Sequence, residues 1–114
     1  MVDIARHRFE ELVGEAIDAL PDELAAAIDN LVVRVHERHP DDPELLGLYE
    51  GVPLTERADA GGGWPDIVTI YREPLLQLCG TEDEVRDEVR VTVIHELAHH
   101  FGVDDDRLDE LGWA

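Results

Sequence analysis

A segment near the end of the sequence, HELAHHFGVDD, combines the side-chain types that bind and use a metal ion. His95 and His99 are four residues apart, so on an α-helix both imidazoles lie on one side and can reach the same ion. Glu96 is set off to the side of this pair, where a carboxylate can take a proton from water without ligating the metal. Gly102 permits a sharp turn, after which Asp105 can return to the ion as a third ligand. Two histidines and a carboxylate, with a fourth position left open, are typical of a catalytic zinc site.

Neighbouring residues leave other assignments in this segment open. Asp104 and Asp106 flank Asp105, so the third ligand could be displaced by one position. Either of the two could instead cap a short terminal helix, which we expect over 104–111. His100 points away from the ligand pair, and we expect it to pack against the protein or to lie at the surface.

Several further side chains could assist such a site, although each also has an ordinary structural role. Two tyrosines could offer a hydroxyl to an oxyanion, but tyrosines on strands usually lie in the core or at an edge. A tryptophan after three glycines could line the cleft or anchor a loop. The single cysteine is expected to be buried, and two histidines at a strand end and a turn are expected at the surface. These residues are Tyr49, Tyr71, Trp64, Cys79, His36 and His39.

A long helix is predicted to carry the two histidines. Thr81 and Glu84 match a capping box, and Gly102 can end a helix in the left-handed conformation, so a helix is predicted over Glu82–Phe101. In its C-terminal half, apolar residues from Val91 onward cover most of the circumference, so that half is expected to be buried. The stripe left between them is expected to face a cleft. It contains Glu88, Thr92, His95 and His99.

The remaining sequence predicts a small sheet and further helices around this element. Apolar periodicity indicates a helix up to Pro21, followed by a short helix or turn, and Pro74 limits the last strand. We therefore predict one α+β domain over residues 1–114, with a short β-sheet packed under helices, one of them long. The expected short helix or turn is Asp22–Ile28, the expected strands are Asn30–His36, Leu46–Glu50 and Asp66–Arg72, and the long loop is Gly51–Pro65.

The charge balance narrows the classes of partner. Acidic residues number 28 against 9 basic residues, which gives a net charge of −19. Such a surface repels phosphate backbones and anionic membranes, so neither nucleic acid nor a membrane is expected as a partner, although acidity can also serve solubility alone. No apolar run approaches the ~18 residues that cross a bilayer. The N-terminal residues lack the pattern of a signal peptide, so the cytoplasm is the expected location.

The segment HELAHHFGVDD resembles the HExxHxxGxx(H/D) signature of zincins, and the chain is similar to the minimal zincins, small bacterial metallopeptidase-like domains. The resemblance implies a Zn²⁺ ion held by His95, His99 and Asp105, with Glu96 as the general base. It also extends to the strand before the long helix, within Pro65–Leu75. The implied activity is hydrolysis of a peptide or protein substrate in a zincin-like fold.

The sequence thus predicts a zinc metallopeptidase, and we expect an extended substrate to pair with an exposed edge of Asp66–Arg72. Two alternatives remain open. Certain zinc endoribonucleases carry a similar HxxxHxxGxxH frame, but Glu96, Asp105 and the acidic surface fit RNA cleavage poorly. The other alternative is a non-catalytic module in which the metal stabilises the fold or a partner interface, because a small chain gains noticeably from a bound metal.

Overall fold

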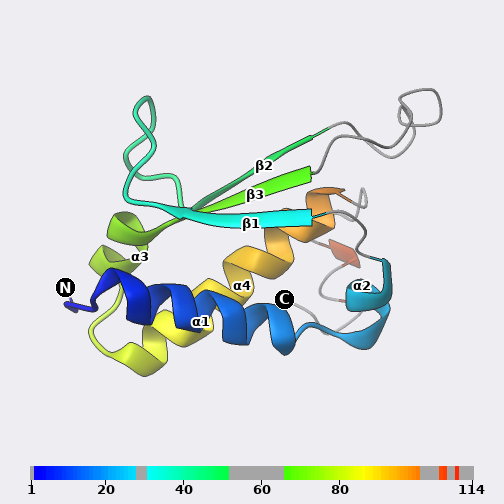
Figure 1. The fold of residues 1–114 in the computed structure, drawn as a ribbon, viewed down its shortest axis with the longest axis horizontal. Coiled ribbons are helices and arrows are strands. Elements are labelled where there is room, and N and C mark those ends of the chain that lie inside the picture. The colour runs from blue at the N-terminus through cyan, green and yellow to red at the C-terminus, as the bar shows by residue number, and fades with distance from the viewer. Residues whose placement is uncertain (1, 28–30, 52–65, 101–105, 108–109, 111–114) are drawn as a thin grey trace.

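A three-stranded sheet with helices beneath one face forms the main part of the chain (Figure 1). The computed structural model describes residues 2–27, 31–51, 66–100, 106–107 and 110. The predicted α+β fold is confirmed. In chain order the elements are α1 (Arg6–Asp18), α2 (Asp22–Ala27), β1 (Leu31–His36), β2 (Gly47–Glu50), β3 (Asp66–Tyr71), α3 (Arg72–Leu78) and α4 (Glu82–His100).

Strand β3 lies in the middle of the sheet. It pairs in parallel with β1, where Val33 is opposite Val68, and antiparallel with β2, where Tyr49 is opposite the same residue. The prediction that Asp66–Arg72 offers an open edge to a substrate is therefore wrong, because β3 has a strand on both sides. The edge strands of the described sheet are β1 and β2.

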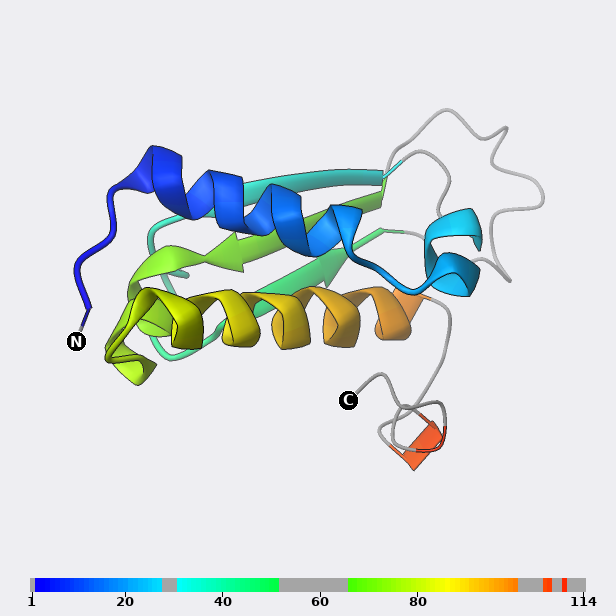
Figure 2. The same cartoon turned by 90° about the horizontal axis from the view of Figure 1, so that it is seen from below.

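The core lies between the sheet and two long helices. Side chains alternate across a strand, so Val35, Val68 and Ile70 point to the helical side and are buried. Helix α1 buries a stripe at helical spacing, and Figure 2 shows α1 and α4 side by side across the sheet. This stripe confirms the apolar face predicted for the first helix, and it consists of Phe9, Leu12, Val13 and Ala16.

Helix α3 is absent from the sequence-based prediction. Pro74 correctly predicts an end to the preceding strand, which stops at Tyr71. However, proline also suits the first turn of a helix, where N–H groups need no partner within the helix. The helix is held in place because Leu75 and Leu76 are buried and because Arg72 Nε donates a hydrogen bond to the backbone oxygen of Ile4 at 3.1 Å.

The cysteine and the two histidines predicted to be buried and at the surface, respectively, lie as expected. Cys79 is buried, and burial, followed by the charges of Glu88 and Glu84, raises the pKa of its thiol, which favours the protonated form. His36 is exposed and His39 is partly exposed, and both rings contact the buried Tyr71 edge-on.

No described helix is long and apolar enough to cross a membrane. The predicted loop over Gly51–Pro65 lies almost entirely outside the described residues.

Ion pairs join α1 to the first turns of α4. Arg8 Nε donates to Glu82 Oε1 at 3.0 Å, and Arg86 Nε donates to Glu15 Oε2 at 3.2 Å. The hydrogen bond from Arg8 lowers the pKa of Glu82, and the same bond raises the pKa of Arg8. A carboxyl group whose pKa is lowered in the folded protein stabilises the fold above its ordinary pKa, and this contribution is lost as the pH falls.

We therefore expect Arg8→Met to destabilise the protein at neutral pH and to lose this effect in acid. The difference in unfolding free energy between wild type and variant should shrink as the pH falls through the range in which Glu82 becomes protonated. Urea unfolding at a series of pH values measures it, with Arg90→Met, an exposed arginine on α4, as the control. A loss that is equal at neutral and acid pH would show that Arg8 acts through packing instead of charge.

Candidate active site

Helix α4 carries the candidate site, and its beginning is set by local sequence. The backbone N–H of Glu84 donates to Thr81 Oγ1 at 3.1 Å, and the Thr81 hydroxyl donates to Glu84 Oε1 at 3.3 Å. The predicted cap is therefore confirmed. Glu82 and Asp83 also lie in the first turn, where negative charge interacts favourably with the helix dipole. The predicted end at Phe101 and Gly102 lies outside the described residues.

The buried face of α4 determines where its other residues point. A ridge of four fully buried apolar side chains repeats every four residues along the helix, so it packs as one continuous line on the core. Val91 differs from the prediction, because its side chain is 40% exposed and lines a cleft instead of joining the core. The ridge consists of Val85, Val89, Val93 and Leu97.

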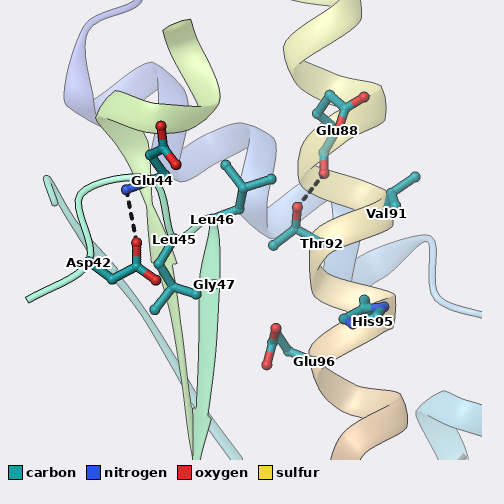
Figure 3. A pocket seen from close by; sticks show the side chains of 10 residues that line it. All are labelled: Asp42, Glu44, Leu45, Leu46, Gly47, Glu88, Val91, Thr92, His95 and Glu96. Carbon is teal, nitrogen blue, oxygen red and sulfur yellow. Dashed lines mark hydrogen bonds between the residues drawn. The ribbon is translucent and has the colours of Figure 1, made fainter. Parts of the chain in front are cut away.

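A cleft of about 440 Å³ lies between α4 and the segment that leads into β2. Three members of the predicted stripe, Glu88, Thr92 and His95, line it as expected, and Glu96 lines it as well (Figure 3). The opposite wall and the mouth come from the segment before and at the start of β2. The residues of that segment are Asp42, Glu44, Leu45, Leu46 and Gly47.

His95 and Glu96 occupy different surroundings although they are neighbours in the sequence. The His95 side chain is partly exposed along the helix, whereas Glu96 is only 8% exposed. Figure 3 shows Glu96 extending from α4 toward the strand that holds Gly47. The structure thus places an imidazole that is partly open to the cleft next to a sheltered carboxylate.

The structure places the side chain of His95 but not those of the other two predicted metal ligands. His99 lies one helical turn after His95 in α4, but the structure describes its backbone and not its side chain. Asp105 lies outside the described residues, as does Asp104. Among the side chains that are described, no three or more from His, Cys, Asp and Glu gather as a metal-binding group. The described donor, the His95 imidazole, fits zinc, and the buried Glu96 beside it fits a base.

The other candidate residues lie away from this cleft or outside the described residues. The Tyr49 hydroxyl donates to Asp66 Oδ1 at 3.1 Å, which ties β2 to β3. Tyr71 lies at the end of β3, and burial, followed by the charge of Glu50, raises its pKa. Neither tyrosine lines the cleft. Trp64 lies outside the described residues.

Sequence reasoning missed the wall opposite α4. Asp42 and Glu44 belong to a turn in which the backbone N–H of Glu44 donates to Asp42 Oδ1 at 3.3 Å, a pattern that carries no functional signal. Gly47 did carry a signal, because a glycine at a strand position indicates that another chain segment approaches closely. The segment that approaches it is α4 at Thr92 and Glu96.

The protein family follows from comparison with known proteins. Residues 28–113 match the family of zincin-like metallopeptidases. The chain belongs to this family. The match covers the sheet, the cleft and α4, so the metal-dependent hydrolase class applies to this zincin-like protein in general.

One solved structure supports the fold of this zincin-like chain. A conserved hypothetical protein from Thermus thermophilus superposes with a TM-score of 0.59 and is 24% identical in sequence. The alignment covers 86% of this chain and 94% of the other. At this identity the likeness concerns the fold alone. No protein with a curated description matches the sequence.

The cap of α4 gives a direct test of how the helix that carries the site is held. We expect Thr81→Ala to lower the free energy of unfolding by about 1 kcal/mol, because the N–H of Glu84 loses its acceptor. Thr81→Ser keeps the hydroxyl and should retain most of the stability. Chemical denaturation of the three proteins measures the difference. Equal losses in both variants would assign the effect to the methyl group and contradict the capping role.

Proposed function

We propose that this protein is a zinc-dependent peptidase in which His95, His99 and Asp105 hold the metal and Glu96 is the general base. One observation supports the proposal most directly. His95 and Glu96, which are adjacent in the sequence, line the same cleft beside the first residues of β2. The family match supports zinc hydrolase chemistry for a site of this kind.

The proposed reaction gives each residue a distinct task. Glu96 removes a proton from the water that attacks the scissile carbonyl and later delivers that proton to the leaving amine. Its position is suited to this task because burial limits competing bulk water around the carboxylate. A zinc ion bound by the three ligands would supply Lewis acidity, which acidifies water and polarises the carbonyl.

We propose that the substrate pairs with the open edge of β2 and not with β3. Strand β2 is an edge strand of the described sheet and pairs with β3 on its inner side. Leu46, just before β2, accepts the N–H of Tyr71 at 2.9 Å. A terminal strand presents backbone groups with which an extended peptide can pair. The start of β2 also lines the cleft that contains Glu96, so a peptide bound along this strand would pass the proposed base.

The charge of the cleft favours cationic substrates. Asp42, Glu44 and Glu88 line it together with Glu96, whereas no arginine does so among the described residues. A concave surface lined by charge of one sign concentrates its field and raises the local concentration of ligands of opposite sign. We propose peptides with basic side chains near the scissile bond as the preferred substrate class.

The same charges weigh against the ribonuclease alternative. A cleft lined by carboxylates repels the phosphates of a bound RNA strand. The non-catalytic alternative differs from the peptidase in its metal coordination, because it requires a fourth protein ligand in place of water. The number of protein ligands on the zinc, measured by X-ray absorption spectroscopy, together with peptide and RNA cleavage assays therefore separates the three functions.

The role of Glu96 is tested by Glu96→Gln. The variant should bind about one zinc per chain, as wild type does, while its peptide cleavage falls by about 100-fold or more, because the amide cannot accept the proton. Zinc analysis and a fluorogenic peptide assay provide the two readouts. Asp87→Asn, an exposed residue on the same helix, is the control and should match wild type. Cleavage at the wild-type rate by Glu96→Gln would refute the assigned role.

The proposed preference for basic substrates is tested with matched peptides. Two peptides that differ only by Arg or Glu beside the scissile bond should differ in kcat/KM by about tenfold or more in favour of the Arg peptide. The difference should decrease as sodium chloride is added, because salt screens the field. Glu88→Gln should lower the ratio of kcat/KM for the Arg peptide to kcat/KM for the Glu peptide, while the variant still binds zinc. An equal ratio for wild type and variant would exclude Glu88 as a determinant of specificity.

A further inference from the structure

Strand β2 and helix α4 approach each other closely at a glycine. A Cβ atom added to Gly47 would lie 2.8 Å from Thr92 Cγ2, 3.1 Å from Glu96 Cγ and 3.4 Å from the backbone oxygen of Thr69. Cβ atoms essentially never approach other heavy atoms within 3.0 Å. With Thr92 in place, the strand and the helix can therefore keep this spacing only while position 47 has no side chain.

The neighbours of Gly47 differ in how freely they can move. Thr69 lies on the central strand β3, and its backbone is fixed by pairing on both sides. The hydroxyl of Thr92 donates to the backbone oxygen of Glu88 at 2.8 Å, which holds the orientation of its methyl group toward Gly47. The stem of Glu96 has two further rotatable bonds beyond Cβ, and it is the most easily displaced of the three.

The side chain of Glu96 thus packs against the backbone of Gly47. An added Cβ would meet its Cγ at 3.1 Å, a contact that a shift of a few tenths of an ångström relieves, but the methyl group of Thr92 at 2.8 Å opposes that shift. The carboxylate at the end of this side chain lines the cleft. General-base catalysis depends on a carboxylate held within about 0.5 Å of its productive position. A change in this contact would move the carboxylate while leaving His95 on its side of the helix.

We propose that Gly47, with the methyl group of Thr92, is a positioning residue for Glu96. Gly47 acts by leaving room for the stem of Glu96 against β2, which aims the carboxylate into the cleft. The inference rests on the proposed function, because it concerns the alignment of the proposed base.

The contact is tested by a double-mutant cycle of Gly47→Ala, Thr92→Ser and the double variant. Serine keeps the hydroxyl but removes the methyl that the new Cβ would meet at 2.8 Å. The control is Gly14→Ala, because a Cβ at position 14 meets no atom within 4 Å. In metal-free protein, the loss of stability caused by Gly47→Ala should be smaller in the Thr92→Ser background, whereas Gly14→Ala should show no such coupling.

The positioning role is tested by activity and by spectroscopy. Gly47→Ala should lower kcat by about tenfold or more with about one zinc still bound and with KM changed by less than about threefold. In the double variant, kcat should return to within about threefold of Thr92→Ser alone. The carboxyl-carbon NMR shift of Glu96, assigned by its loss in Glu96→Gln, should move in Gly47→Ala and return in the double variant.

The outcomes separate this inference from the proposed function. If wild type cleaves no peptide, the peptidase proposal fails, and the NMR shift together with the unfolding cycle decides the inference alone. Wild-type kcat and an unchanged Glu96 shift in Gly47→Ala would overturn the inference. If Gly47→Ala does not fold, the double variant replaces it. A folded double variant with kcat close to that of Thr92→Ser supports the inference, whereas its failure to fold or to cleave peptide overturns it.

Discussion

The burial of one face of α4 against the core is the constraint on which the candidate site depends. Val85, Val89, Val93 and Leu97 are fully buried along this face, and burying a side chain of this kind stabilises a fold by about 1.5–3 kcal/mol. Because successive residues turn by about 100° around a helix, fixing this ridge fixes the direction of every other residue. Rotation by a single position would bury the His95 imidazole and would expose part of the ridge. The orientation of the site is therefore set by residues that take no part in its chemistry.

Local features of α4 could be predicted because their causes lie within a few residues. The cap requires only Thr81 and Glu84, and the stripe of Glu88, Thr92 and His95 follows from helical periodicity. The chemical roles of Glu96 and the metal ligands remain proposals, since no described contact tests them. The prediction that Val91 is buried was wrong, because periodicity shows how apolar a helix is but does not show which part of its circumference meets the core.

The position of β3 could not be predicted because strand order depends on contacts between distant parts of the chain. Asp66 and Thr69 are polar, as residues of exposed strands often are, yet both are fully buried. Thr69 is covered on the outer face by Arg34 of β1, whose Nε donates to its hydroxyl at 3.0 Å. Nothing in residues 66–71 indicates this cover, and nothing near Gly47 shows that α4, more than 30 residues later, would lie against it.

The distribution of ion pairs gives the cleft its electrostatic character. Arg6, Arg8, Arg72 and Arg86 form pairs with carboxylates on α1, α4 and the residues that follow β1. Among the described residues, Asp42, Glu44 and Glu88 of the cleft lining take part in none of the ion pairs. The arginines therefore stabilise the packing of helices and strands, and they leave the cleft with its negative charge. The net charge of −19 alone would not have shown this separation.

The short terminal strand β2 has a consequence for how the protein responds to heat. It contains four residues and pairs with a single strand in the described sheet, whereas α4 is anchored along its whole buried ridge. Segments with few anchoring contacts open at lower free energy than the core. On warming, β2 would begin to fray while α1 and α4 remain folded, and the backing of Glu96 would loosen with it. The cleft would then lose its shape before the helices melt cooperatively.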